Sequence, residues 1–262
     1  MRLVAWNANY NRHRRALEDD VAILRQFDAD VLVISETAPP RTENPCGAVF
    51  TGGTPGLAVI ARDGVTIEPY DVGDAPPRLS LGFRIVAPWR HDVIAVWPVS
   101  GPGMPSYHEV LMATLEHFGP LLTPGRAIMA GDFNSSSRVV AQAASHPSFV
   151  ARAAECGLVS AYHEITGEAH GKETIGTYRH GAGNSYAYHL DYCFVSRPLL
   201  SSIRYRVCDD PSWDALSDHR PVVLDVEEPA GGEGRPPNPC GKEASTKRKE
   251  KTERDLDRLQ GR

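Results

Sequence analysis

The sequence predicts a single α/β (α+β) domain in which strands outnumber helices. Three observations support this fold class. The chain of 262 residues is 41% hydrophobic, enough for a substantial core. Strand-like runs often follow one another directly, without the regular alternation of a simple βαβ protein. No Ser/Gly-rich linker interrupts residues 1–227, so we expect one domain there and a disordered, charged tail over residues 228–262.

The strand predictions rest on short apolar runs of the length and composition that sheets favour. The continuous run Val31–Ile34 is typical of a strand covered on both faces. The run at 186–195 alternates, which predicts one strand with His189 and Asp191 on the same face. The complete set of expected strands covers residues 2–6, 31–34, 56–61, 79–87, 92–99, 126–130, 186–195, 205–207 and 222–224.

Two helices are predicted from apolar spacing and a capping signal. In the segment from Arg14 to Phe27, apolar residues recur at helical spacing and form one face. A second helix is expected to begin at Ser106, because Glu109 three residues later fits a capping box. Apolar residues at helical spacing follow it as far as Phe118.

Polar residues sit at the edges of five of these strands, and this pattern points to a functional site. Carboxylates and amides are costly to bury unless they are paired or bind metal. The period of two along a strand predicts that Asp132 and Asn134 point to the same side. One such strand edge could arise by chance, but five of them, spread over more than two hundred residues, indicate one assembled polar site. Its members are Asn7 and Asn9, Glu36, Asp132 and Asn134, His189 and Asp191, and Asp218 with His219.

Cysteine usage and charge narrow the class of protein. The five cysteines show no CxxC spacing, which argues against a disulfide framework and a structural zinc site. No apolar run reaches membrane-spanning length, and no signal-peptide pattern opens the chain. We therefore expect a soluble, cytoplasmic monomer that does not act at a membrane.

The net charge of -5 divides into +3 from Pro229 onward and -8 before it. Such an acidic body suits a site that needs divalent cations before it accepts phosphate.

The residue types at the strand edges suit phosphoester hydrolysis with a hard cation. Mg²⁺ or Mn²⁺ prefers oxygen ligands, which Glu36, Asp218 and the amide of Asn7 could supply. Asp132 is a credible activator of water, and Asn134 a donor to the phosphate or to Asp132. His219 is a donor to phosphate, with Asp191 as the acceptor on its other ring nitrogen. No GxSxG motif and no cysteine in a recognisable catalytic context competes with this interpretation.

This constellation resembles the endonuclease/exonuclease/phosphatase superfamily, which includes exonuclease III, abasic-site endonucleases, DNase I and inositol polyphosphate phosphatases. The resemblance implies a DNase I-like four-layer sandwich of two packed mixed β-sheets flanked by helices. It also implies a metal near Asn7, Glu36 and Asp218, with Asp132, Asn134, Asp191 and His219 at the scissile phosphate. The motifs occur in the family's order over nearly all of the first 225 residues: Trp6-Asn7, Ser35-Glu36-Thr37, Gly131-Asp132-Phe133-Asn134, Leu190-Asp191-Tyr192 and Ser217-Asp218-His219.

One strand departs from the family's pattern. Many members carry a polar residue that contacts phosphate on the central strand, but residues 93–99 here contain no His or Asn. Tyr107 and His108 follow nearby and are candidate substitutes, although packing at a helix start is the favoured role for Tyr107. Asn9 is a further candidate for substrate binding, since some relatives have a metal-linked Asp there.

Other aromatic and basic residues have two competing interpretations. For His189, a structural hydrogen bond is about as plausible as contact with phosphate. Trp213 suits stacking on a base or sugar, but packing in the core is at least as plausible. Tyr178 and Arg179 lie upstream of the His-Leu-Asp segment and could approach a phosphate, with a surface role as the default for Arg179. His163, His170 and His180 lack ligand spacing and are interpreted as surface or structural residues.

The leading hypothesis is a Mg²⁺- or Mn²⁺-dependent phosphodiester hydrolase, a nuclease with DNA as its substrate. The alternative is a phosphatase or phosphodiesterase of small phosphate esters such as inositol phosphates or nucleotides. A non-catalytic binding protein that kept the fold is the third hypothesis. It is disfavoured because packing alone would not demand Glu36, Asp132, Asn134, Asp191 and His219 together.

Overall fold

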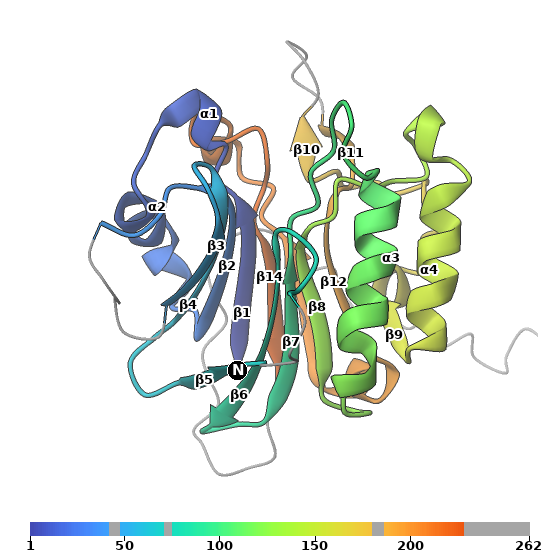
Figure 1. Ribbon diagram of the computed structural model, residues 1–262, viewed down its shortest axis with the longest axis horizontal. Helices are drawn as coiled ribbons and strands as arrows, with labels where there is room; N and C mark the ends of the chain where they lie inside the picture. The colour runs from blue at the N-terminus through green and yellow to red at the C-terminus, as the bar shows by residue number, and fades with distance from the viewer. Residues whose placement is uncertain (42–47, 71–74, 180–185, 228–262) are drawn as a thin grey trace, which may run out of the picture.

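Two six-stranded β-sheets pack face to face, and helices cover their outer faces (Figure 1). The computed structural model describes residues 1–41, 48–70, 75–179 and 186–227. The predicted tail at residues 228–262 lies outside the described residues. The four layers confirm the predicted fold class. Among the described residues, no helix combines the length and the hydropathy that crossing a membrane would require.

The two sheets are built alike, each with one parallel pair of strands near its middle. In the first sheet β1 runs parallel to β2, and in the second β7 runs parallel to β8. The first sheet has the strand order β13 (Ile203–Val207), β14 (Val222–Val226), β1 (Arg2–Asn7), β2 (Val31–Thr37), β4 (Gly56–Ala61), β3 (Ala48–Gly52). The second sheet has the order β5 (Thr66–Pro69), β6 (Ser80–Ala87), β7 (His91–Val96), β8 (Ala127–Asp132), β12 (Asp191–Ser196), β9 (Leu158–Ser160).

Helices α1 to α4 lie on the two outer faces, and a short hairpin lies at one end. Figure 1 shows α1 and α2 beside the first sheet and α3 and α4 beside the second. The α-helices are α1 (Tyr10–His13), α2 (Leu17–Leu24), α3 (Tyr107–Phe118), α4 (Ser145–Glu155) and α5 (Ala161–Thr166). The 3-10 helices are η1 (Arg25–Phe27), η2 (Gly119–Leu121), η3 (Val140–Gln142), η4 (Arg197–Ser202) and η5 (Pro211–Ala215). The hairpin pairs β10 (Tyr178–Arg179) with β11 (Tyr186–Tyr188).

Three clusters of buried apolar side chains hold these layers together. The largest lies between the sheets, where Val33 of the first sheet and Ala95 of the second belong to the same cluster. A second cluster joins the second sheet to α3 and α4 through residues such as Leu111 and Phe149. The third joins the first sheet to α2 and η5, and includes Trp213. Both sheets are therefore buried on both faces, as the continuous aliphatic runs predicted.

The long strand predicted over residues 186–195 is wrong, because the chain breaks at His189 and Leu190. Tyr186–Tyr188 pairs with β10, whereas Asp191–Ser196 pairs with β8 and β9. The Leu190 carbonyl accepts a hydrogen bond from the Phe133 backbone N–H at 2.8 Å, just beyond the end of β8. The break matters for function, since it separates His189 from Asp191.

Candidate active site

Five predicted polar residues come together at the end of the sandwich where β1, β2 and β8 finish. Asn7 is the last residue of β1, Glu36 the penultimate residue of β2 and Asp132 the last residue of β8. Asp191 begins β12, and His219 precedes β14 by a few residues. In Figure 1 this is the upper end, away from the labelled N-terminus. The prediction that separate strand edges assemble into one polar site is confirmed for these positions.

The two sheets meet through a direct contact between site residues. The Asn7 side chain donates a hydrogen bond from Nδ2 to Asp132 Oδ2 at 2.9 Å, joining β1 to β8. Within the second sheet Asp132 lies directly opposite Asp191 in the antiparallel pairing of β8 and β12. Facing residues of such a pair lie about 5 Å apart, so two buried carboxylates share one small region.

Gly131 lets β8 pass close to β7 immediately before Asp132. Its φ angle of 142° lies in a region that residues with a side chain rarely adopt. A Cβ atom at this position would lie 2.1 Å from the carbonyl oxygen of Val96. Only glycine fits there, which explains why the acidic residue follows a glycine in the motif.

Three site residues adopt left-handed backbone conformations, with φ near 50° at Asn9, Glu36 and Asn134. Such conformations are unfavourable for residues other than glycine, and they cluster at functional sites. The turn at Asn134 also overturns the predicted shared face, because β8 ends at Asp132. The Asn134 backbone N–H donates to Asp132 Oδ1 at 2.8 Å, while its side chain donates to the Pro98 carbonyl at 3.1 Å.

Asp191 and His219 form a buried ion pair, as the sequence predicted for an oriented histidine. His219 Nδ1 lies 2.8 Å from Asp191 Oδ2, and both residues are almost fully buried. Burial by itself would lower the histidine pKa, but the negative charges of Asp191 and Asp132 raise the pKa of His219 to about 10. His219 is therefore a cation at neutral pH and presents positive charge to the site.

Burial disfavours the charged forms of two further carboxyl groups of the site, Asp132 and Glu36. Burial raises the pKa of Asp132 to about 7, with His219, Asn7 and the Asn134 backbone opposing the rise and Asp191 adding to it. Burial likewise raises the pKa of Glu36, while His219 and a hydrogen bond from Asn7 lower it. A carboxyl group poised near neutrality can take up a proton during a reaction.

Asp218 and Asn9 complete the polar cluster beside the end of β1. Asn9 Nδ2 donates to Asp218 Oδ1 at 2.8 Å, and the Asn9 backbone N–H donates to Asn7 Oδ1 at 2.9 Å. The Ser217 hydroxyl donates to the Asn7 carbonyl at 2.7 Å and accepts from the His219 backbone N–H at 3.0 Å. The Ser-Asp-His turn is thus fixed to the end of β1 by side-chain hydrogen bonds.

Two tyrosines border this cluster, and one of them was not among the predicted site residues. Tyr107 opens α3, and its pKa is raised by burial and by the negative charges of Asp132 and Glu36. The Tyr178 ring lies 4.7 Å from the His219 ring between centroids, in a β-bridge with that residue. Only the proximity of Tyr178 to the His-Leu-Asp segment hinted at its place. Arg179 is instead paired with Asp214 at 3.3 Å.

Two candidate substrate-binding residues lie in the core and cannot reach a substrate. His189 is fully buried, and its Nδ1 forms a hydrogen bond with the Ile175 carbonyl at 2.9 Å. Trp213 is 2% exposed and stacks on Phe27 with ring centroids 5.5 Å apart. It also meets Trp6 edge to face. For both residues the structural interpretation is correct, and the proposed contact with substrate is wrong.

The charge balance of the site fits a divalent cation. Four carboxylates meet there, those of Glu36, Asp132, Asp191 and Asp218. Among the residues that the structure describes, only one of these four carboxylates forms an ion pair, that of Asp191 with His219. Asp191 Oδ1 is buried without a hydrogen-bond partner among these residues. Uncompensated buried carboxylates are costly, so oxygen ligands in excess of nearby cations suit Mg²⁺ or Mn²⁺.

Comparison with known proteins shows which family this chain belongs to. The model of the Endonuclease/Exonuclease/phosphatase family matches residues 4–219. A search of curated proteins finds no match. Among solved structures, an AP endonuclease from Archaeoglobus fulgidus is 18% identical with a TM-score of 0.67, over 87% of this chain and 100% of that chain. The 3′ phosphatase NExo from Neisseria bound to product DNA hairpin is 19% identical with a TM-score of 0.66, over the same shares.

A third solved structure is the endonuclease domain of TRAS1, a telomere-specific non-LTR retrotransposon. It is 19% identical with a TM-score of 0.62, over 86% of this chain and 97% of that chain. These similarities establish the shared fold, and the family match covers most of the sequence together with the site residues from Asn7 to His219. The chain therefore belongs to the Endonuclease/Exonuclease/phosphatase family and is a metal-dependent phosphoester hydrolase.

Proposed function

We propose that the protein hydrolyses phosphodiester bonds in DNA, with Asp132 activating the attacking water and His219 binding the phosphate. The observation that carries the proposal is the position of Asp132. Its carboxylate lies at the end of β8, oriented by hydrogen bonds from Asn7 and from the backbone of Asn134. A buried carboxylate with a pKa of about 7 suits a general base that works near neutral pH.

Glu36, Asp218 and the amide oxygen of Asn7 would hold the divalent cation. Asn7 Oδ1 already accepts one hydrogen bond from the Asn9 backbone, and a second lone pair remains. The cation would supply charge neutralisation for the phosphate and for the leaving oxygen. Asn9 contributes by holding Asp218 in place at 2.8 Å, so we assign it a positioning role.

The protein's own side chains would then accept the proton of the attacking water and stabilise the negative charge of the phosphate. As the water oxygen bonds to phosphorus, Asp132 takes the water proton and the bond from phosphorus to the leaving oxygen breaks. His219, a cation held by Asp191, donates a hydrogen bond to a non-bridging phosphate oxygen. The Asn134 side chain already donates to Pro98, so its main part is to orient Asp132 through its backbone N–H.

We favour DNA as the substrate because the names of two structural neighbours refer to DNA or to its repair. One is an AP endonuclease, and another is bound to a product DNA hairpin. Tyr107 and Tyr178 flank the carboxylates and would offer hydroxyl groups to a sugar-phosphate backbone. One observation favours small phosphate esters instead. The first 228 residues carry a charge of -8, which weakens non-specific attraction of a polyanion.

A substrate panel distinguishes these possibilities. The purified chain with Mg²⁺ or Mn²⁺ would be given abasic-site duplex, plasmid DNA, single-stranded DNA, RNA and inositol phosphates. Asp132→Asn, which keeps the shape of the side chain, serves as the matched control. Cleavage of DNA by the native protein and its loss in Asp132→Asn is the expected result. Turnover of inositol phosphate alone would overturn the DNA assignment, and no turnover by folded protein would overturn the hydrolase mechanism.

A further inference from the structure

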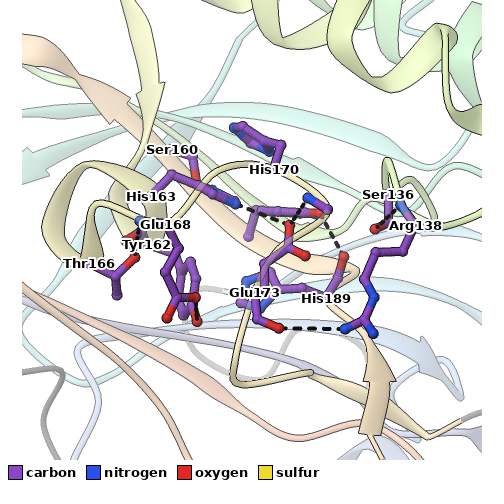
Figure 2. A network of polar contacts seen from close by, with 12 residues as sticks. Ser136, Arg138, Ser160, Tyr162, His163, Thr166, Glu168, His170, Glu173 and His189 are labelled. Carbon is purple, nitrogen blue, oxygen red and sulfur yellow. Dashed lines mark hydrogen bonds and ion pairs between the residues drawn. The ribbon is translucent and has the colours of Figure 1, made fainter.

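A second cluster of imidazole and carboxylate groups lies outside the active site, between α5 and the loop that follows it. His163 belongs to α5, and His170 and Glu173 lie in the loop at residues 167–177 (Figure 2). One ligand atom from each of these three residues lies within 4.8 Å of the other two. The rings of His163 and His170 are stacked with centroids 3.5 Å apart. Three donor groups of metal-binding type thus share one small volume.

One pair in this cluster already has the spacing of two ligands on one ion. His163 Nε2 lies 3.1 Å from Glu173 Oε1. Two ligands of a tetrahedral ion with bonds of about 2.0 Å are separated by roughly 3.3 Å. The Gly171 backbone N–H donates to the same Glu173 oxygen at 2.8 Å, which fixes the carboxylate within the loop.

Both histidines have a polar partner at Nδ1. His163 Nδ1 lies 2.8 Å from the Ser160 hydroxyl, and His170 Nδ1 lies 3.0 Å from His146 Nε2. His146 is in turn held by Ser135, with 2.9 Å between its Nδ1 and the hydroxyl oxygen. Metal-binding histidines typically have such an outer contact, which sets the orientation and tautomer of the ring.

Two polar atoms of the cluster are buried without a hydrogen-bond partner in the part of the chain that the structure describes. They are Glu173 Oε2 and His189 Nε2, in residues that are 5% and 0% exposed. Orphaned buried polar atoms are rare and each demands an explanation. A bound cation would satisfy the carboxylate oxygen, and His189 is an additional donor nearby, with its ring centroid 6.1 Å from that of His163.

We propose that His163, His170 and Glu173 form a binding site for a transition-metal ion of the Zn²⁺ class, with His189 or water as the fourth ligand. Neutral imidazole suits such ions, whereas Mg²⁺ prefers the oxygen ligands of the active site. His170 is half-buried, so an ion can reach the cluster from solvent. The site is therefore separate from the catalytic centre in both position and metal preference.

The ion would fix the loop at residues 167–177, which leads directly to the residues bordering the active site. The loop ends at Thr177, whose hydroxyl oxygen accepts hydrogen bonds from the backbone N–H groups of Leu190 and Asp191 at 2.9 and 3.0 Å. Tyr178, beside His219, follows directly. A metal that ties Glu173 and His170 to α5 would stabilise this segment, so the site has a structural role with an indirect effect on the position of Asp191.

The test measures metal binding by the full chain after treatment with a chelator, in the Glu36→Gln background to weaken cation binding at the catalytic centre. Zn²⁺ binding is followed by calorimetry and metal content, and Co²⁺ by its visible absorption as a probe of tetrahedral ligation. We expect one equivalent of Zn²⁺, a tetrahedral Co²⁺ spectrum, and a rise in Tm on Zn²⁺ addition.

His170→Ala and Glu173→Gln should weaken binding on the order of 100-fold or more and abolish the Tm rise. His117→Ala, a half-buried histidine on α3, is the matched control and should bind like the parent. Glu173→Gln preserves the shape of the side chain and guards against loss of folding in His170→Ala. Equal affinity in Glu173→Gln and His117→Ala, or no binding by the folded parent, would overturn the proposal. In that case the cluster is only a hydrogen-bond network.

Discussion

At the scale of single residues, Gly131 shows most clearly how local backbone geometry creates the site. Its positive φ and the absence of a Cβ atom, which would lie 2.1 Å from the Val96 carbonyl oxygen, let β8 run close beside the end of β7 just before Asp132. Any side chain at this position would push the strands apart, and that displacement would move Asp132 away from Asn7. The glycine is thus required by the geometry of the strand that presents the Asp132 carboxylate.

We therefore expect Gly131→Ala to lower the free energy of unfolding by about 2 kcal/mol or more, through overpacking and backbone strain together. Urea denaturation measures the change. Gly157→Ala is the matched control, because Gly157 also has positive φ, but a Cβ atom added there would meet no atom within 4 Å. A loss no larger than that of the control would contradict the steric argument.

Asp191 controls the charge and orientation of His219. Replacing it in Asp191→Asn removes the largest of the negative charges that raise the pKa of His219, so we expect that pKa to fall. We expect kcat to fall about 10- to 100-fold, as is typical when a group that orients a functional histidine is lost. Steady-state kinetics and NMR titration of His219 check the two parts. A kcat within about twofold of the native value would contradict the role of the pair.

At the scale of elements, Asp92 of β7 connects three segments of the second sheet. It accepts hydrogen bonds from Arg84 of β6 at 2.9 Å and from the Thr123 backbone at 2.8 Å, and it also pairs with the Tyr70 hydroxyl. Burial opposes ionisation, but these hydrogen bonds together hold the pKa of Asp92 below its usual value of 3.8. The charged form of Asp92 is therefore favoured by folding.

The sign of this shift gives a pH-dependent stability. A carboxylate with a lowered folded pKa contributes stability that is present above pH 3.8 and lost as pH falls through the folded pKa. Asp92→Asn should cost about 1 to 3 kcal/mol near pH 7 and progressively less on acidification below pH 3.8. Urea denaturation over this range, with the exposed Asp63→Asn as control, measures the difference. A cost independent of pH would contradict the argument.

Strand ends were predictable from sequence, whereas breaks within strands were not. The apolar runs ending in Asn7, Glu36 and Asp132 have unambiguous composition, and the structure places all three where predicted. The interruption at His189 depends on the Leu190 carbonyl pairing with Phe133, a contact between residues far apart in the chain. Local periodicity carries no information about such pairing, so His189 was assigned to the wrong face.

At the scale of the whole molecule, the active site was predictable because its residues recur in a fixed order at strand ends. The histidine cluster was not, because His146, His163, His170 and His189 come from separate segments without ligand spacing. The sequence predicts surface or structural roles for His163 and His170, and only the fold brings them within reach of Glu173. His180 lies outside the described residues.

The domain boundary gives a prediction at this scale. Secondary structure of the described residues ends with β14 at Val226, and residues 228–262 are rich in Gly, Pro and charged residues. Truncation after Glu227 should leave the free energy of unfolding unchanged and alter kcat/KM for DNA less than about twofold at physiological salt, since a tail of this composition has few apolar side chains to contribute to a core. The opposite result would be a large loss of kcat/KM on truncation, with the same loss in the full chain at high salt. That result would show that the basic tail binds DNA.

The central claim is that the polar residues at one end of the sandwich form a single metal-dependent hydrolytic centre. The most direct test is the rate of DNA cleavage as a function of Mg²⁺ concentration in the native protein, Asp132→Asn and Glu36→Gln. We predict no cleavage after removal of divalent cations and recovery on adding Mg²⁺. Asp132→Asn should lose about 100-fold or more in kcat, and Glu36→Gln should require more Mg²⁺ for half-maximal rate. Cleavage without a divalent cation, or undiminished cleavage by Asp132→Asn, would contradict it.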